Sequence, residues 1–214
     1  MKKVFVIIMA ATAILAGCKH QELTISEGEG SLQVNAVTCE GDYIQVTKAA
    51  EVADFNIVIY RTHDQQIVKE CKYSDIQGQI VKFGSGDYRI CVSSPSQEDA
   101  AWNQPIYYGE QTFKILAGQV TPVTVSCSIS NMKVSITLSD NFKKELTRYD
   151  VAVSNGKGAL VWEKGENRND FEENKAGYFT VGVLTVTVSG YRAIDGTTAT
   201  SSFTIAEVAP RQHH

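Results

Sequence analysis

The sequence has 214 residues, of which 43% are hydrophobic and 21% charged, a composition that builds a packed core and excludes a disordered chain. The formal net charge is −4, and the lack of a basic excess argues against nucleic acid as a partner. Only four histidines are present, which restricts both acid–base catalysis and metal binding, and the five cysteines are an odd number that needs an explanation.

The first eighteen residues resemble the signal of a bacterial lipoprotein. Lys2 and Lys3 precede an uncharged, largely apolar run over residues 4–16. This run is too short to span a bilayer, which takes about twenty helical residues, but it has the length of a secretory signal. It ends in Leu15-Ala16-Gly17-Cys18, where small residues precede a cysteine as in a lipobox. We expect a lipoprotein signal peptide over residues 1–17 and a lipid on Cys18; the alternative is an ordinary signal peptide followed by an unrelated cysteine.

A polar stretch follows Cys18. Residues 18–30 contain several glutamates and nothing that would build a core, so we expect a flexible tether. Surface lipoproteins of the Bacteroidetes carry acidic residues soon after the lipidated cysteine, and Gln21-Glu22 matches that pattern in part. The expected location is the outer membrane, with the protein held by the lipid and exposed at the cell surface; the periplasmic face remains open as an alternative.

From Ser31 onward the apolar residues recur with a period of two, which is typical of strands. Leu32, Val34 and Ala36 alternate with polar residues. A hairpin is expected around the polar turn at residues 62–65. Cys127 lies on the apolar face of a later strand, together with Val123, Val125 and Ile129. The strands expected in this half cover residues 32–36, 55–59, 67–73, 88–92, 111–116 and 120–129.

A second unit is expected from Asn131 onward. Ser139 is a suitable N-cap for a short helix that extends to Arg148. Asn155-Gly156-Lys157-Gly158 predicts a turn, and residues 165–175 read as a polar loop. The strands expected in this half cover residues 132–138, 149–154, 159–163, 178–180, 183–189 and 198–205.

Short strands at this spacing predict an all-β protein made of two tandem antiparallel β-sandwich domains with one short helix. We place the N-terminal domain at residues 31–130 and the C-terminal domain at residues 131–214. No further strand follows residue 205. Either the chain is truncated, which is the interpretation we favour, or the last sheet lacks one strand and leaves an edge that another chain can fill.

Catalytic and metal-binding patterns are weak, and we expect neither an enzyme nor a cofactor. His63 is the one histidine in the expected folded body, and it lies in a turn beside Asp64. No phosphate-binding loop occurs, and the acidic residues between 163 and 173 lack the spacing of a calcium loop. The cysteines lack the spacing of a zinc site, so we expect no metal. A carboxylate pair for glycoside hydrolysis stays open as a third, weaker hypothesis.

Two other features carry hypotheses about chemistry. Without Cys18, an even number of cysteines remains, Cys39, Cys71, Cys91 and Cys127, and outside the cytoplasm these are candidates for disulfides in any of three connectivities. A buried free thiol at Cys127 is the alternative. The aromatic and amide side chains of Trp102, Asn103, Tyr107 and Tyr108 form the best candidate contact for a ligand, in particular for a glycan. The alternative is that Trp102 covers the edge of the sandwich and one tyrosine enters the core.

Six stretches of the sequence are familiar in their order along the chain: residues 54–60, 86–90, 105–109, 117–125, 131–134 and 153–156. Together they resemble a family of Bacteroidetes lipoproteins built around a domain of unknown function, and the resemblance extends over about residues 28–212. That family is similar to fimbrillin-type pilus and adhesin subunits, including the membrane-anchoring kind.

The resemblance implies two transthyretin-like β-sandwich domains and assembly by donation of a strand to a neighbouring subunit. Polymerising subunits of this type are cut after an arginine near the N-terminus. No arginine lies between Cys18 and Arg61, so an anchor-like or stand-alone protein fits better. The leading hypothesis is therefore a lipid-anchored protein for adhesion or fimbria-like assembly, with fimbrial or other surface subunits as partners. The alternative is a glycan-binding surface lipoprotein of a polysaccharide-uptake system.

Overall fold

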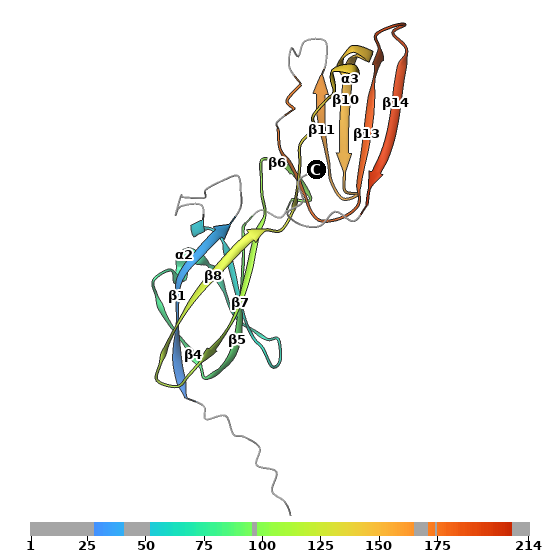
Figure 1. The fold of residues 1–214 in the computed structure, drawn as a ribbon. Coiled ribbons are helices and arrows are strands. Elements are labelled where there is room, and N and C mark those ends of the chain that lie inside the picture. Colours follow the sequence, from blue (N-terminus) through green and yellow to red (C-terminus); the bar gives the residue numbers. More distant parts are fainter. Residues whose placement is uncertain (1–27, 41–51, 96–97, 165–170, 174, 207–214) are drawn as a thin grey trace, which may run out of the picture.

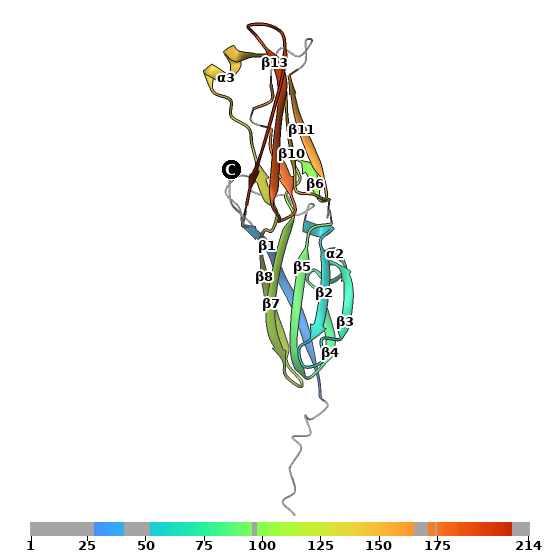
Figure 2. The same cartoon turned by 90° about the vertical axis from the view of Figure 1, so that its right-hand side faces the viewer.

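The computed structural model describes residues 28–40, 52–95, 98–164, 171–173 and 175–206. Strands dominate these residues and form two units that lie end to end (Figures 1 and 2). The predicted signal peptide, Cys18 and most of the tether lie outside the described residues. Within the described part of the chain, no helix has the length and apolar character needed to cross a membrane.

The first unit is built from one seven-stranded sheet. The strands follow the order β3-β2-β5-β7-β8-β1-β4 across the sheet. They span Glu29–Glu40 (β1), Asn56–Arg61 (β2), Ile67–Lys72 (β3), Ile80–Gly84 (β4), Gly86–Ser93 (β5), Tyr107–Ile115 (β7) and Val120–Ile129 (β8). A helix of four residues, α2 (Tyr73–Ile76), joins β3 to β4 and was not anticipated from the sequence.

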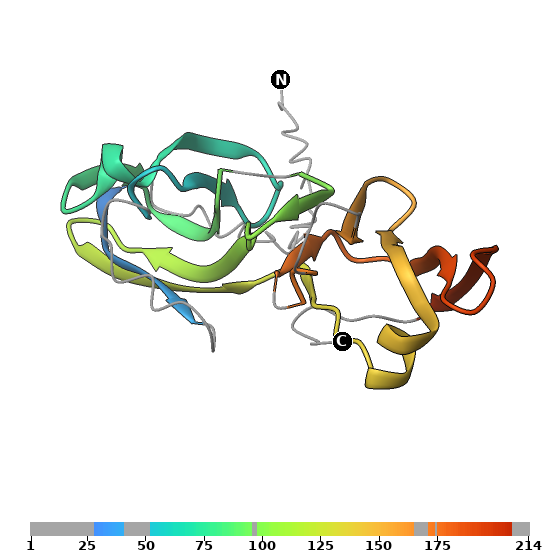
Figure 3. The same cartoon turned by 90° about the horizontal axis from the view of Figure 1, so that it is seen from above.

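This sheet curls so that its two halves face each other across one core (Figure 3). Side chains from β2 and β5, such as Ile57 and Ile90, belong to the same buried cluster as Leu32 of β1 and Val125 of β8. All four are fully buried, and such apolar burial is the main driving force for folding. The single sheet therefore acts as both layers of a sandwich.

One pair of strands in this unit runs parallel, although antiparallel pairing was expected. β1 lies beside β8 with Ser31 opposite Val120 and Cys39 opposite Cys127. Hairpin turns enforce antiparallel pairing only between strands that follow one another closely, and β1 and β8 are separated by most of the first unit. The direction of β1 is therefore free to follow the packing of its apolar face.

A β-bulge in β1 changes which residues face the core. The register with β8 shifts by one residue between Val34 and Ala36. Before the bulge Leu32 and Val34 are buried, and after it Val37 is buried while Ala36 is only partly covered. The regular alternation expected through Ala36 therefore stops there, because an extra residue on one strand moves all later side chains to the other face.

The second unit is a sandwich of two sheets. The larger sheet has the order β11-β10-β13-β14, and the smaller one has the order β6-β12-β9. The larger sheet comprises Leu146–Ser154 (β10), Ala159–Lys164 (β11), Leu184–Arg192 (β13) and Thr198–Ile205 (β14). The smaller sheet comprises Ala100–Trp102 (β6), Met132–Val134 (β9) and Gly177–Phe179 (β12), and a short helix, α3 (Asp140–Glu145), precedes β10. Between the sheets Met132, Val153 and Phe179 are fully buried.

Strand β6 belongs to the second unit although its sequence lies between β5 and β7 of the first. Ala101 of β6 pairs with Tyr178 of β12. Where the chain returns, the side-chain amide of Asn131 accepts a hydrogen bond from the backbone N–H of Ile106 (3.0 Å) and is itself almost fully buried. In the sequence, the residues of the first core give way to those of the second near residue 130. Strand β6 is the exception, because it lies within the first stretch of sequence but belongs to the second unit.

The prediction of an all-β fold of two sandwiches is confirmed, and most of the expected strands occur within two or three residues of their expected ends. Ser139 caps α3 as expected by accepting a hydrogen bond from the backbone N–H of Phe142 (3.2 Å), although the helix ends at Glu145 rather than Arg148. The Asn155-Gly156 turn is also present, with Gly156 at φ +83°, a conformation that glycine adopts without strain.

Candidate functional site

The inner face of the larger sheet of the second unit loses its cover between β13 and β14. In the register of these strands, Leu184 lies opposite Ile205 and Val186 opposite Phe203, so all four side chains share one face. Leu184 and Val186 are buried, whereas Phe203 is 53% exposed. The apolar face that forms the core under β13 thus continues onto β14 but reaches solvent there.

The cause is a difference in width between the two sheets. The larger sheet has four strands, and the opposing sheet has three strands of three residues each. Among the described strands, β14 pairs only with β13, and β9 pairs only with β12, so both end their sheets. The smaller sheet contributes no described strand that could cover β14.

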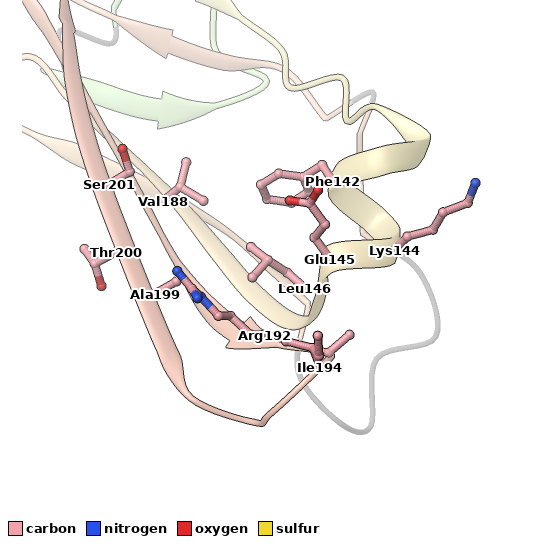
Figure 4. A pocket seen from close by; sticks show the side chains of 11 residues that line it. Phe142, Lys144, Glu145, Leu146, Val188, Arg192, Ile194, Ala199, Thr200 and Ser201 are labelled. Carbon is pink, nitrogen blue, oxygen red and sulfur yellow. The ribbon is translucent and has the colours of Figure 1, made fainter.

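A cavity of about 610 Å³ lies beside β14, between this strand and helix α3 (Figure 4). Apolar side chains form most of its wall, and charged and hydroxyl groups lie around them. The apolar lining consists of Phe142, Leu146, Val188, Ala193, Ile194 and Ala199, and the polar lining consists of Lys144, Glu145, Arg192, Thr200 and Ser201. We call the cavity and the exposed inner face of β14 together the β14 groove.

Helix α3 is fixed as one wall of the groove. The backbone N–H of Ala193 donates a hydrogen bond to the carbonyl of Glu145 (2.7 Å), which ties the end of the helix to the β13–β14 turn. The ring of Phe142 packs edge-on against Tyr149 with centroids 5.0 Å apart. Lys143 on the helix forms an ion pair with Glu173. These contacts fix the position of the helix beside the cavity.

The turn between β13 and β14 forms the end of the groove. The carboxylate of Asp195 accepts hydrogen bonds from the hydroxyl (2.7 Å) and the backbone N–H (3.0 Å) of Thr197, and these bonds lower the pKa of Asp195. This local network leaves Ile194 at the tip, 90% exposed. A large aliphatic side chain held so openly is a usual sign of an interaction surface when other apolar groups lie beside it.

Strand β14 lacks the features that normally protect a sheet edge. Its sequence, Thr-Ala-Thr-Ser-Ser-Phe-Thr-Ile, contains no charged residue and no proline. Natural edge strands are shielded by such residues, by bulges or by a covering element. The register of β14 with β13 is regular over all eight residues. The side of β14 that faces no other described strand therefore offers main-chain hydrogen bonds to an added strand, and the groove offers contacts to every second side chain of that strand.

The candidate ligand residues lie in three different environments. Trp102 packs edge-on against Trp162 of the second core (centroids 4.6 Å apart), and the ammonium group of Lys175 lies 4.4 Å from the Trp102 ring centroid. Tyr107 is buried in the first core and stacks on Phe55.

Tyr108 points to the opposite face of β7 from Tyr107. It is 40% exposed and donates a hydrogen bond to Glu110 (2.9 Å). Partial burial, followed by contacts with Cys91 and Glu110, raises the pKa of Tyr108. Asn103 is exposed and has φ +54°. The four residues therefore do not form one aromatic surface.

Among the described cysteines, the structure brings one pair together. Cys39 of β1 lies opposite Cys127 of β8, whereas Cys71 packs against the first core and Cys91 contacts Tyr108 and Glu110. His63 is exposed and lies 3.4 Å from the carboxylate of Asp64. No group of three metal-ligating side chains occurs within the described residues; Glu166 and Asp170 of the acidic loop lie outside them.

The sequence predicted only some of the features that form the β14 groove. Phe142 and Leu146 have helical spacing, and the strand that contains Phe203 was expected. No sequence signal indicates that Phe203 reaches solvent, because its exposure depends on which strands lie opposite it.

Comparison with known families decides the classification of the chain. The family model of the domain of unknown function DUF4493 matches residues 28–214. The chain belongs to the DUF4493 family. The match begins where the described structure begins and includes both units, so the DUF4493 domain comprises the two sandwiches together. None of the curated proteins matches the sequence.

Solved structures similar to this DUF4493 protein share little sequence with it. A candidate adhesin from Bacteroides ovatus is 10% identical with a TM-score of 0.41, and the match covers 90% of this chain and 88% of that one. A candidate cell adhesion protein from Bacteroides thetaiotaomicron is 10% identical with a TM-score of 0.39, covering 86% and 89%. The shaft pilin SpaA from Lactobacillus rhamnosus is 9% identical with a TM-score of 0.31, covering 88% and 96%.

Proposed function

We propose that this DUF4493 protein is a non-enzymatic, lipid-anchored protein of the outer membrane that takes part in adhesion or fimbria-like assembly at the cell surface. Its partner contact is the β14 groove, which accepts an extended strand from another surface subunit. The observation that carries the proposal is the uncharged edge of β14, which pairs with no described strand besides β13 and lies beside a mainly apolar cavity of about 610 Å³.

The chemistry of the groove defines the segment that it accepts. An added strand beside β14 presents alternate side chains to the inner face, so its apolar residues must recur with a period of two. These residues would cover Phe203, Ala199 and Ile194. The partner is therefore a strand with alternating apolar residues rather than an amphipathic helix, whose period of 3.6 does not match a sheet edge.

The glycan-binding alternative gains no support from the described residues. Its candidate ligand contact consists of Trp102, Asn103, Tyr107 and Tyr108. The rings of Trp102 and Tyr107 pack against aromatic side chains of the second and the first core. It remains a hypothesis that a glycan-array screen tests directly.

Site-specific photo-crosslinking tests the groove in living cells. A photoreactive amino acid is placed at Ser201, whose side chain lies on the inner face of β14 and lines the cavity. We expect an adduct with a surface subunit, with the crosslinked peptide mapping to a segment of alternating apolar residues. Phe203→Asp should abolish the adduct, because it places a charge in the groove. Val161→Asp is the matched control, because Val161 is 41% exposed on the outer edge strand β11, far across the sheet from β14.

An adduct that survives Phe203→Asp, or one that maps only to a helical or irregular segment, would refute strand pairing at this site. A crosslink to a second copy of this chain would identify self-assembly as the form of the interaction. The anchor is tested separately: Cys18→Ala should move the protein from the membrane fraction to the soluble fraction, and unchanged membrane retention would contradict lipidation.

A further inference from the structure

Two cysteines that are 88 residues apart in the sequence face each other in the first unit. The parallel register of β1 and β8 places Cys39 opposite Cys127. The bulge in β1 produces this alignment, because the register that precedes it would set Cys39 opposite Ser128 instead. The bulge also turns Cys39 toward the core, where Cys127 already lies fully buried.

The geometry of this pair suits a covalent bond. Neighbouring strands lie about 4.8 Å apart, and this spacing falls within the range of about 4.4–6.8 Å between the Cα atoms of a disulfide. Both thiols also lie on the core face of their strands, where Cys39 packs against the buried cluster that contains Cys127 and interacts with it. This contact lowers the pKa of Cys39, while the same contact and burial raise the pKa of Cys127.

We propose that Cys39 and Cys127 form a disulfide in the exported protein and that this bond carries tension across the first unit. The inference rests on the proposed export, because disulfides persist outside the cytoplasm. Each thiol loses its proton, one S–S bond forms, and the two electrons reduce the disulfide of a thiol oxidant of the envelope to two thiols. Cys39, half-buried and more acidic, attacks the oxidant first, and Cys127 then displaces it.

The other two cysteines of the body remain thiols. Cys71 packs its side chain against the core, whereas Cys91 contacts Tyr108 and Glu110 on the opposite face of the sheet. β2 separates the two strands that carry them. Opposite faces direct the two Cβ atoms apart, so no disulfide joins them without rearrangement.

The position of the pair gives the bond a mechanical role. Tension between an N-terminal anchor and a partner in the β14 groove enters the first unit at Glu29, the start of β1, and leaves it at Ile129, the end of β8. β1 and β8 are parallel neighbours, so a pull on the start of β1 and on the end of β8 acts in opposite directions along two adjacent strands. The pull therefore shears all the hydrogen bonds between these two strands at the same time. With the disulfide closed, the force passes from β1 to β8 through sulfur, and the chain between residues 39 and 127 is not stretched.

Peptide mapping of protein purified from the cell envelope tests the bond itself. Without reductant we expect a linked peptide that joins Cys39 to Cys127, and it should disappear on reduction. Cys39→Ser should remove the linked peptide and leave no substitute bond. Cys71→Ser, another half-buried cysteine of the same unit, should leave the linked peptide unchanged. Free thiols at both positions in the envelope protein would overturn the proposal, whatever the crosslinking at Ser201 shows.

Single-molecule stretching of the full chain by its two ends tests the mechanical role. Reduction should lengthen the chain released from the first unit by about 300 Å, since an extended chain spans about 3.3–3.6 Å per residue. Reduction should also lower the melting temperature by about 10 °C or more, because the bond closes a long loop. Wild-type protein with and without reductant makes this comparison without any substitution in the core. Equal released lengths in the two states would refute the tension-bearing role.

Discussion

Replacing Trp102 with alanine tests whether this side chain serves the core of the second unit or a ligand at the surface. The residue lies in β6, between two strands of the first unit, yet its ring contacts Trp162 of β11 and the ammonium group of Lys175. Its backbone pairs with Gly177 of β12. We therefore expect Trp102→Ala to destabilise the second unit, although the residue precedes that unit in the sequence.

The size of the effect follows from three contributions. The edge-to-face contact with Trp162 is worth about 0.5–1.5 kcal/mol, and the contact with the Lys175 ammonium is worth about 0.5–1 kcal/mol. Truncation of a fully buried tryptophan costs about 3–5 kcal/mol, and the half-burial of Trp102 places its apolar contribution at the lower end. These contributions overlap, so the expected loss is about 2–4 kcal/mol.

Urea denaturation followed by far-ultraviolet circular dichroism measures this loss without depending on tryptophan fluorescence. Tyr108→Ala is the control, because Tyr108 is 40% exposed on the first unit, and it should cost about 1 kcal/mol or less. A Trp102→Ala protein that is as stable as wild type but has lost binding to a glycan would refute the assignment of Trp102 to the core and would support the alternative function.

Two further predictions concern the contacts that hold the second unit together. Asn155→Ala should lower the free energy of unfolding, measured by urea denaturation, by about 2–3 kcal/mol. The side-chain NH2 group of Asn155 donates to the hydroxyl of Thr180 and the carbonyl of Asp99, and its side-chain oxygen accepts from the backbone N–H of Gly158. Lys157→Ala, in the same turn, is the control and should change little. Lys143 lowers the pKa of Glu173, so their ion pair stabilises the fold above the ordinary carboxyl pKa, and this stabilisation is lost as the pH falls through the lowered value. Glu173→Gln should therefore lower the melting temperature near neutral pH but not in acid below the lowered pKa of Glu173, and a difference that persists there would contradict the ion pair as its cause.

Local patterns in the sequence were sufficient to predict most of the strands. Alternation of apolar and polar residues predicted β2, β5 and β8, because side chains on successive residues of a strand point to opposite faces. Ser139 predicted the start of α3, since its hydroxyl accepts a backbone hydrogen bond at that position. Both signals depend on a few neighbouring residues and are therefore present in the sequence itself.

Other features were decided by contacts between distant segments. β6 spans only three residues and becomes a strand because β12 lies beside it, and the bulge in β1 is defined only by its partner β8. Four cysteines follow Cys18 in the sequence, and they can be paired in three ways. The sequence does not choose among these pairings, whereas the parallel alignment of β1 and β8 places Cys39 opposite Cys127.

The sequence by itself predicted the all-β fold and the two units, because periodicity and short motifs are local properties of the chain; the lipobox at Cys18 stays a prediction. The tertiary structure decided that Phe203 is exposed beside an apolar groove. The physical reason is that the burial of a side chain depends on the width of the sheet opposite it, and three short strands do not cover four long ones.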